Sequence, residues 1–263
     1  MGAGQTCFII FFPFFFTIAA LVLTIFVIIG NLDINGILSK LYFMQLNTQN
    51  LSITVQGDTF SAHSLDPNFP GFFQVGLWNY CEGSISDNTY TLTNCTATRG
   101  LFYFNPLTVI ENRLGIDTIE NVPSQVSTAL NAVKAISYVM TILFIIGAAF
   151  TVMQAITGIL SFRSRICTVI SSLPALACLI VATALATALY YVEARAFQDA
   201  NSTLGTTASI NTVTFGIAWA AVVAAILATL FWCLSLCCGS SRDRRKGQMV
   251  YHPVESPIPM QQI

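Results

Sequence analysis

Two of the eight cysteines, Cys81 and Cys95, lie in the one long polar segment of the chain, residues 31–134. The chemistry open to them is oxidation to a disulfide, if that segment faces an oxidising compartment. Closing a loop of this length would contribute roughly 3 kcal/mol on the chain-entropy model. The alternative is two free thiols, which are uncommon outside cells. We therefore expect a cystine, provided that the segment lies outside the cell.

Three further cysteines, Cys233, Cys237 and Cys238, lie at the end of the last apolar stretch. Cysteines beside a membrane surface are candidates for palmitoylation. They are equally ordinary as small apolar residues of a helix. No histidine accompanies them, which disfavours metal binding. The pattern leaves acylation and plain packing as equal alternatives.

A basic run follows these cysteines and consists of Arg242, Arg244, Arg245 and Lys246, interrupted by Asp243. Basic residues near a membrane surface attract anionic lipid, and each charge contributes about 1 kcal/mol. The same residues also set the topology of the adjacent span, which is a sufficient explanation by itself. Contact with anionic lipid is therefore a candidate role for the run.

Residues for enzymatic chemistry are hard to find in the sequence. The two histidines, His63 and His252, are predicted to lie on opposite sides of a membrane. The sequence contains no glycine-rich phosphate loop, no paired-cysteine metal spacing and no nucleophile elbow. A formal net charge of −1 gives no electrostatic case for binding nucleic acid. We predict a protein that is not an enzyme and holds no cofactor.

Most of the chain is too apolar to face water. Hydrophobic residues make up 54% of it and charged residues 9%, whereas about a quarter of a soluble domain is charged. A bilayer takes roughly 20 apolar residues to cross, and four stretches without charge are long enough: 8–30, 135–160, 166–192 and 213–238. The first lacks the basic leader and the cleavage site of a signal peptide. We predict four transmembrane helices.

The basic residues orient these spans in the membrane. Arginines in the short turn at 161–165, and the basic run within 239–263, place both segments in the cytoplasm. Because the number of spans is even, residues 1–7 lie on the same side. Residues 31–134 and 193–212 then form two extracellular loops of a multi-pass membrane protein.

All three N-x-S/T sequons, at Asn50, Asn94 and Asn201, fall in the segments predicted to lie outside. That is the side on which a glycosylated chain needs them. Asn94 would be a poor acceptor beside a paired Cys95. The sequons support the topology without proving it.

The first outer segment has the pattern of a small antiparallel sheet. Short runs that are β-branched or aromatic, separated by Gly, Asn, Asp and Pro, are typical of strands, and they occur at 41–44, 52–55, 72–78 and 90–93. Val-Pro-Ser at 122–124 predicts the start of a helix that continues into span two. The outer domain would then be rigidly coupled to the helices.

The predicted fold is an α-helical membrane protein in which a four-transmembrane-helix bundle carries a small disulfide-linked extracellular antiparallel β-domain. Small residues in spans two to four predict a tight bundle, because packing drives helix association in lipid. Span one is hydrophobic all round, so we expect it to face lipid. Trp78 is expected to pack against the cystine or to lie at the lipid interface, and both roles are structural.

Gly76, Leu77, Trp78 and Cys81 form the pattern G-L-W-x-x-C, which is followed by Cys95. In the first outer loop of a four-span chain, this pattern resembles the claudin-like superfamily. Claudins carry an earlier tryptophan in this loop that is lacking here, which disfavours junctional adhesion or a paracellular pore.

Further matches are Leu-Tyr-Phe at 41–43, Tyr-Cys-Glu-Gly at 80–83 and Phe-Asn-Pro at 104–106. With them the chain resembles the fungal SUR/PalI family of cortical-patch membrane proteins, and the resemblance covers nearly the whole chain. It implies a structural role for the motif and a claudin-like fold.

Membership of this family would imply a non-enzymatic organiser of fungal plasma-membrane microdomains, the eisosome compartments. Membrane organisation, cell-wall integrity and stress response are the implied roles, with lateral association between cortical membrane proteins. A PalI-like accessory to ambient-pH signalling is the alternative, although that branch usually has a longer cytoplasmic tail. A pore or transporter is a third reading, which the charge-free spans disfavour.

Overall fold

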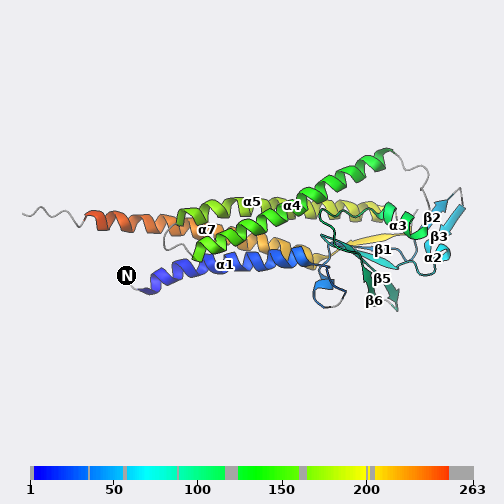
Figure 1. Cartoon of the computed structure of the whole chain (residues 1–263), viewed down its shortest axis with the longest axis horizontal. Helices are drawn as coiled ribbons and strands as arrows, with labels where there is room; N and C mark the ends of the chain where they lie inside the picture. Colours follow the sequence, from blue (N-terminus) through cyan, green and yellow to red (C-terminus); the bar gives the residue numbers. More distant parts are fainter. Residues whose placement is uncertain are drawn as a thin grey trace, which may run out of the picture.

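The computed structural model describes residues 3–34, 36–55, 58–87, 89–115, 124–159, 165–199, 201 and 205–248. Four long helices lie lengthwise beside one another, with the strands gathered at one end (Figure 1). They are α1 (Ala3–Ile29), α4 (Ser124–Ile159), α5 (Arg165–Asp199) and α7 (Thr212–Gln248). Each contains a stretch that is long and apolar enough to cross a membrane. The prediction of four spans is confirmed.

The helices extend beyond the predicted spans. Helix α4 begins at Ser124, within the predicted start pattern, although Pro123 lies outside the described residues. Helix α5 continues to Asp199, and α7 continues to Gln248. The first part of the predicted tail is therefore helical, while the rest of it and most of the turn at 161–165 lie outside the described residues.

A five-stranded antiparallel sheet lies at one end of the bundle, which we call the sheet end. In spatial order its strands are β6 (Thr89–Cys95), β5 (Tyr80–Ser86), β4 (Phe72–Val75), β1 (Met44–Asn47) and β7 (Thr207–Ile210). A second, two-stranded sheet pairs β2 (Ser52–Val55) with β3 (Asp58–Ser61). The short helices near the sheets are η1 (Leu38–Lys40), α2 (Ala62–Leu65) and α3 (Pro106–Leu114).

The predicted sheet is confirmed, with corrections to its strands. The prediction for 52–55 is right in type and bounds, and that for 90–93 identifies the middle of β6. The prediction for 41–44 was too early, because β1 begins at Met44. The prediction for 72–78 was too long, because the chain turns back after Val75. Strands β3, β5 and β7 were not predicted.

Strand β7 brings the second predicted loop into the same sheet as the first. Met44 of β1 pairs with Ile210, and Asn47 pairs with Thr207. This pairing joins residues more than 150 positions apart. The local sequence of a four-residue strand does not predict which strand it pairs with. The two predicted outer loops therefore contribute strands to one sheet.

A buried aromatic cluster fixes the sheet to the helices. The ring of Phe43, only 1% exposed, stacks on Tyr190 of α5 with 4.9 Å between ring centroids. The Phe215 ring of α7 lies edge-on to Phe43 at 5.7 Å. Aromatic pairs at these distances add about 0.5–1.5 kcal/mol beyond the area they bury. The Asn211 side chain also donates Nδ2 to the Lys40 carbonyl oxygen at 2.6 Å.

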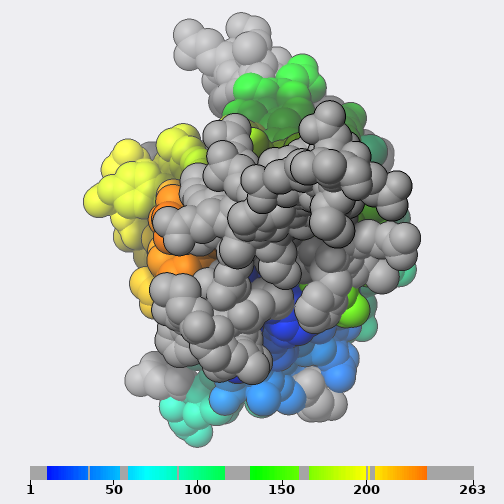
Figure 2. Space-filling view, turned by 90° about the vertical axis from the view of Figure 1, so that its left-hand side faces the viewer, coloured from blue at the N-terminus to red at the C-terminus, as the bar shows by residue number. Residues whose placement is uncertain are grey.

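Small residues allow the helices to approach closely. A methyl group on Gly147 would lie 3.0 Å from Leu179 Cδ2, and one on Gly158 would lie 3.1 Å from Trp232 Cζ2. Small residues at helix contacts are what packing in lipid favours. Figure 2 views the molecule from the end opposite the sheet and shows α7, in orange, between α5, in yellow, and α1, in blue.

Span one, which was expected to face lipid, is exposed on one side and packed against other helices on another. Thr17, Ala20, Thr24 and Val27 are each at most 2% exposed, and their spacing places them on one face of α1. That face packs against α7 and α4. Phe15, on another face, is 55% exposed. Residues of uniform hydropathy gave no sign of which side would be covered.

A polar cluster lies buried inside the bundle, around the hydroxyl of Thr17. The hydroxyl donates to the Pro13 carbonyl oxygen at 2.8 Å. Its oxygen lies 3.3 Å from Gln154 Nε2 of α4 and 3.3 Å from Trp232 Nε1 of α7, and both nitrogens donate to it. One side chain therefore holds three helices together.

We expect Thr17→Val to weaken the bundle by about 1 kcal/mol, because interhelical hydrogen bonds in membranes average about 0.6 kcal/mol and two are lost. The midpoint of thermal unfolding in detergent measures this change. Thr24→Val is the matched control, since the Thr24 hydroxyl bonds to the Ala20 carbonyl within the same helix. Equal effects of the two variants would show that the cluster does not join helices.

Candidate functional site

The G-L-W-x-x-C motif forms the turn between β4 and β5. The Gly76 N–H donates to the Asn79 carbonyl oxygen at 2.9 Å, so Leu77 and Trp78 are the two residues of the turn. Leu77 is buried, at 1% exposed. A side chain at position 76 would lie 2.9 Å from Asn31 Cβ, closer than such carbons pack. The glycine is therefore needed where the turn meets the end of α1.

Trp78 connects this turn to the first membrane helix. Its indole Nε1 donates to the Ile28 carbonyl oxygen at 2.7 Å. Ile28 lies in the last turn of α1, where carbonyl groups have no partner inside the helix. An indole N–H removed from water needs an acceptor, and here it meets one of these carbonyls. Neither role predicted for Trp78 included this bond.

We expect Trp78→Phe to weaken the contact between the tryptophan turn and α1 by about 1 kcal/mol, because the ring remains while one hydrogen bond is lost. Hydrogen exchange of the amides in residues 31–38 should become faster, since that turn follows the capped helix end. Trp219→Phe is the matched control, because Trp219 is 42% exposed and bonds to Thr187 within the bundle. Unchanged exchange in Trp78→Phe would contradict the capping role.

Asn31 completes the connection between α1 and the sheet. It follows the helix with a φ of 62°, a left-handed conformation that asparagine adopts more readily than most residues. It is 0% exposed, and its Nδ2 donates to the Gln74 carbonyl oxygen of β4 at 3.2 Å. Its own N–H donates to the Leu38 carbonyl oxygen at 2.8 Å. Gly-Asn after an apolar helix is a helix-end signal that the sequence contains.

The structure confirms the cystine between Cys81 and Cys95, which face each other across β5 and β6. Their Cα atoms are 4.0 Å apart, and Cys81 is 0% exposed. The bond therefore fastens β6, the edge strand, to the strand that follows the tryptophan turn.

The chain just after the cystine folds back onto the motif. The Thr96 N–H donates to the Tyr80 carbonyl oxygen at 2.9 Å, and the Tyr80 N–H donates to Thr96 Oγ1 at 3.2 Å. The Tyr80 ring packs on Phe104, with centroids 5.7 Å apart. Burial raises the pKa of Tyr80 above its ordinary value, and the nearby Glu82 carboxylate raises it further. The phenol is accordingly neutral.

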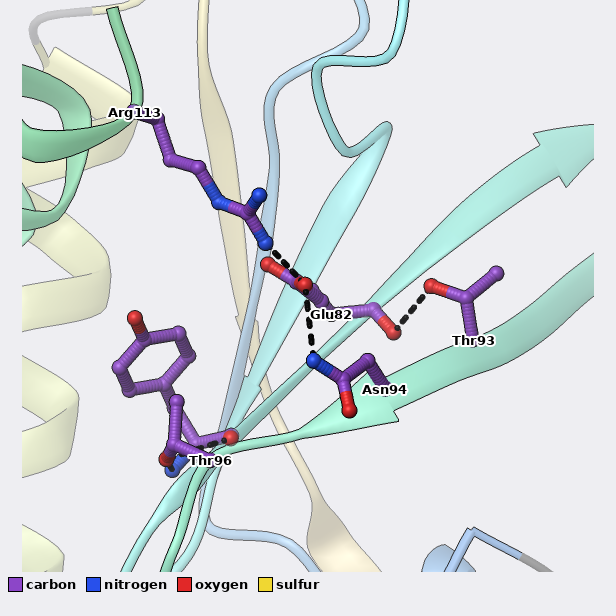
Figure 3. Close-up of polar contacts among 6 residues, drawn as sticks. Glu82, Thr93, Asn94, Thr96 and Arg113 are labelled. Carbon is purple, nitrogen blue, oxygen red and sulfur yellow. Dashed lines mark hydrogen bonds and ion pairs between the residues drawn. The ribbon is translucent and has the colours of Figure 1, made fainter. Parts of the chain in front are cut away.

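Glu82, next to the cystine, binds the side chain of Arg113 in an ion pair (Figure 3). Its Oε1 also lies 3.4 Å from Asn94 Nδ2, and its backbone oxygen accepts from Thr93 Oγ1 at 3.1 Å. Glu82 is 6% exposed, and an ionised group at such burial is normally paired. The ion pair joins β5 to helix α3.

Helix α3 presents Arg113 and was not predicted from the sequence. Asn105 precedes it, and its side-chain oxygen accepts from Leu107 N at 3.1 Å, while Pro106 is the first helical residue. Asparagine as N-cap followed by proline is a helix-start signal. The Phe-Asn-Pro tripeptide therefore has a local role that the sequence contained.

Among the other candidate residues, Asn94 precedes Cys95 and contacts Glu82, while the rest take no part in these contacts. Asn50, Asn94 and Asn201 are exposed at the sheet end. Cys233 is partly buried in α7, and the backbone of Cys237, Cys238, Arg242, Arg244, Arg245 and Lys246 continues the same helix. His252 lies outside the described residues.

These contacts form the joint between the membrane helices and the sheet, and what the joint can do is hold these elements together. The tryptophan turn, the cystine and the Glu82–Arg113 pair link α1, the sheet and α3 through contacts between residues far apart in the sequence. In the part of the chain that the structure describes, no group of three or more His, Cys, Asp or Glu residues is placed to hold a metal ion. The fold and the joint define a multi-pass membrane protein with a disulfide-linked sheet at one end of a four-helix bundle.

A family model described as the SUR7/PalI family matches residues 9–231. The chain belongs to the SUR7/PalI family, which confirms the resemblance carried by its motifs.

Two fungal relatives are similar to the chain. One is "Protein PUN1" of Saccharomyces cerevisiae, 22% identical over 241 residues, which cover 86% of this chain and 90% of that protein. The other is "SUR7 family protein pun1" of Schizosaccharomyces pombe, 34% identical over 96 residues. The second match covers 35% of this chain, and the chain spans only 33% of that relative.

Proposed function

We propose that the protein is a structural organiser of a fungal plasma-membrane domain at the cell cortex and catalyses no reaction. The observation that carries the proposal is the joint, in which Trp78 bonds to the end of α1 beside the Cys81–Cys95 cystine. A sheet held in this way moves with its membrane helices. Membership of the SUR7/PalI family supports the proposal.

The sheet end is proposed to lie outside the cell, with both termini in the cytoplasm. The cystine supports this orientation, because disulfides persist in oxidising compartments. The basic residues at the far end of α7 support it as well, since basic segments stay on the cytoplasmic side. Exposed Asn50, Asn94 and Asn201 are then the proposed sites of N-glycosylation.

Lateral association in the bilayer is the proposed means of organisation. Large apolar side chains point away from the bundle, among them Ile170 and Val192, each 65% exposed. Such faces contact lipid or neighbouring membrane proteins. Acylation of the cysteines at the end of α7 and contact of its basic run with anionic lipid would add attachment to the inner leaflet. Support of wall integrity and stress tolerance follows as a proposed consequence.

Imaging of a fluorescently tagged copy in a fungal cell tests the proposal. We expect stable patches at the cell cortex, and uniform fluorescence around the rim would contradict it. The alternative, an accessory to ambient-pH signalling, is tested by deleting the gene and growing cells at alkaline pH. We expect the transcription factor of that pathway to be processed normally, and a block in its processing would favour the signalling role.

A further inference from the structure

A cleft lies within the sheet domain, beside the Glu82–Arg113 ion pair. Its volume is about 380 Å³, and its walls come from α2, the loop that follows it, β5, β6 and α3. Helix α2 and the β2–β3 hairpin occupy the end of the molecule farthest from α1 (Figure 1). The volume falls within the range of small-molecule sites, about 300–1,000 Å³.

Among the described residues, the lining of the cleft combines polar side chains with Phe69, Ile85 and two prolines, and its one acidic and one basic side chain balance. The two charged side chains are Glu82 and Arg113, which are paired with each other. Gln49 and Asn68, both exposed, add amide donors and acceptors. A lining with balanced charge gives no advantage to a strongly anionic or cationic ligand, while donors and acceptors together suit hydroxyl groups, which both donate and accept.

The ion pair between Glu82 and Arg113 lines the cleft. Glu82 is 6% exposed, and its Oε2 accepts no hydrogen bond from the described residues, whereas Oε1 is bound by Arg113 and Asn94. A buried carboxylate oxygen without a donor is unfavourable, and a ligand hydroxyl is a group that can satisfy it. The Arg113 side chain is 41% exposed. It can turn to admit a ligand and still offers unused N–H groups of its planar fork.

We propose that this cleft binds a neutral carbohydrate, through the Glu82–Arg113 pair together with His63 and Asn68. Sites that hydrogen-bond a hydroxyl group discriminate strongly against ligands that lack it. Binding in this cleft does not depend on where the protein lies. Its physiological source as a wall glycan rests on the proposed function, which places the sheet end outside the cell.

Binding is measured with the purified full-length chain in nanodiscs, because the sugar headgroups of maltoside detergents would compete. The probes are oligosaccharides of β-1,3-linked glucose, β-1,4-linked N-acetylglucosamine and α-linked mannose, with inorganic phosphate as the anionic probe. We expect saturable binding of at least one oligosaccharide and none of phosphate. Binding of phosphate alone, or of no oligosaccharide, would overturn the proposal without touching the proposed function, which imaging tests separately.

Variants locate the binding in this cleft. Asn68→Ala should weaken it about five- to tenfold, the loss expected for one hydrogen bond. Arg113→Lys should weaken it further, because a lysine keeps the charge opposite Glu82 but loses the planar fork. The matched control is Asn112→Ala, an exposed asparagine of α3 that lines a different cleft. Equal affinity of Asn68→Ala, Asn112→Ala and the unchanged protein would overturn the assignment.

Discussion

Gly83→Ala is expected to destabilise the sheet by about 3 kcal/mol or more, because overpacking typically costs 1–3 kcal/mol and here meets backbone as well. A Cβ atom at this position would lie 2.3 Å from the Thr91 carbonyl oxygen and 2.4 Å from Phe72 Cζ. Phe72 is 0% exposed and cannot turn away. This steric clash is relieved only when β5 moves away from β6, and these are the two strands that the cystine joins.

Two measurements follow the effect of Gly83→Ala. The midpoint of thermal unfolding should fall, and the fraction of molecules with the Cys81–Cys95 bond, determined by thiol labelling after denaturation, should fall as well. Gly100→Ala is the matched control, since no atom of the described residues would lie within 4 Å of a Cβ at that position and its φ is not left-handed. A Gly83→Ala protein as stable as Gly100→Ala would show that the two strands are more loosely packed than described.

Removal of the cystine by the double change Cys81→Ala and Cys95→Ala is expected to cost about 3 kcal/mol on the chain-entropy model. The two cysteines are 14 residues apart, so the bond closes a loop of the size for which that model gives this value. The unfolded chain gains conformational entropy when the covalent loop is removed. The edge strand β6 is then held to β5 by hydrogen bonds without a covalent bond. The thermal midpoint of the purified protein measures the loss.

Cys178→Ala is the control for the cystine variant, because Cys178 is a free, partly buried cysteine of α5. It should change the midpoint much less. Imaging of the same variants links stability to the proposed function: the double variant should reach cortical patches in smaller amounts, while Cys178→Ala should not. If the double variant kept the midpoint of the unchanged protein, the cystine would not be what holds the sheet together.

The family motif acquires a physical meaning from these contacts. Gly76 leaves room for Asn31, Trp78 binds the end of α1, and Cys81 binds Cys95. Glu82, the residue after Cys81, fastens α3 through Arg113. Each of these residues stabilises a contact between different elements of the fold.

The sequence alone determined the membrane helices and the cystine. Four charge-free stretches identify four spans, because the thickness of the bilayer fixes the length that a helix needs. The pairing of Cys81 with Cys95 followed because no other cysteine lies in the predicted outer segments. The helix at Asn105-Pro106 and the turn at Asn31 also have local signals in the sequence.

Only the tertiary structure decided the partners of these elements. The pairing of β7 with β1, the bond from Trp78 to Ile28, the polar cluster around Thr17 and the pairing of Glu82 with Arg113 were all absent from the predictions. Hydropathy and secondary-structure propensity describe one stretch of the chain at a time. The partner of a side chain depends on how the whole chain packs, so a single stretch cannot specify it.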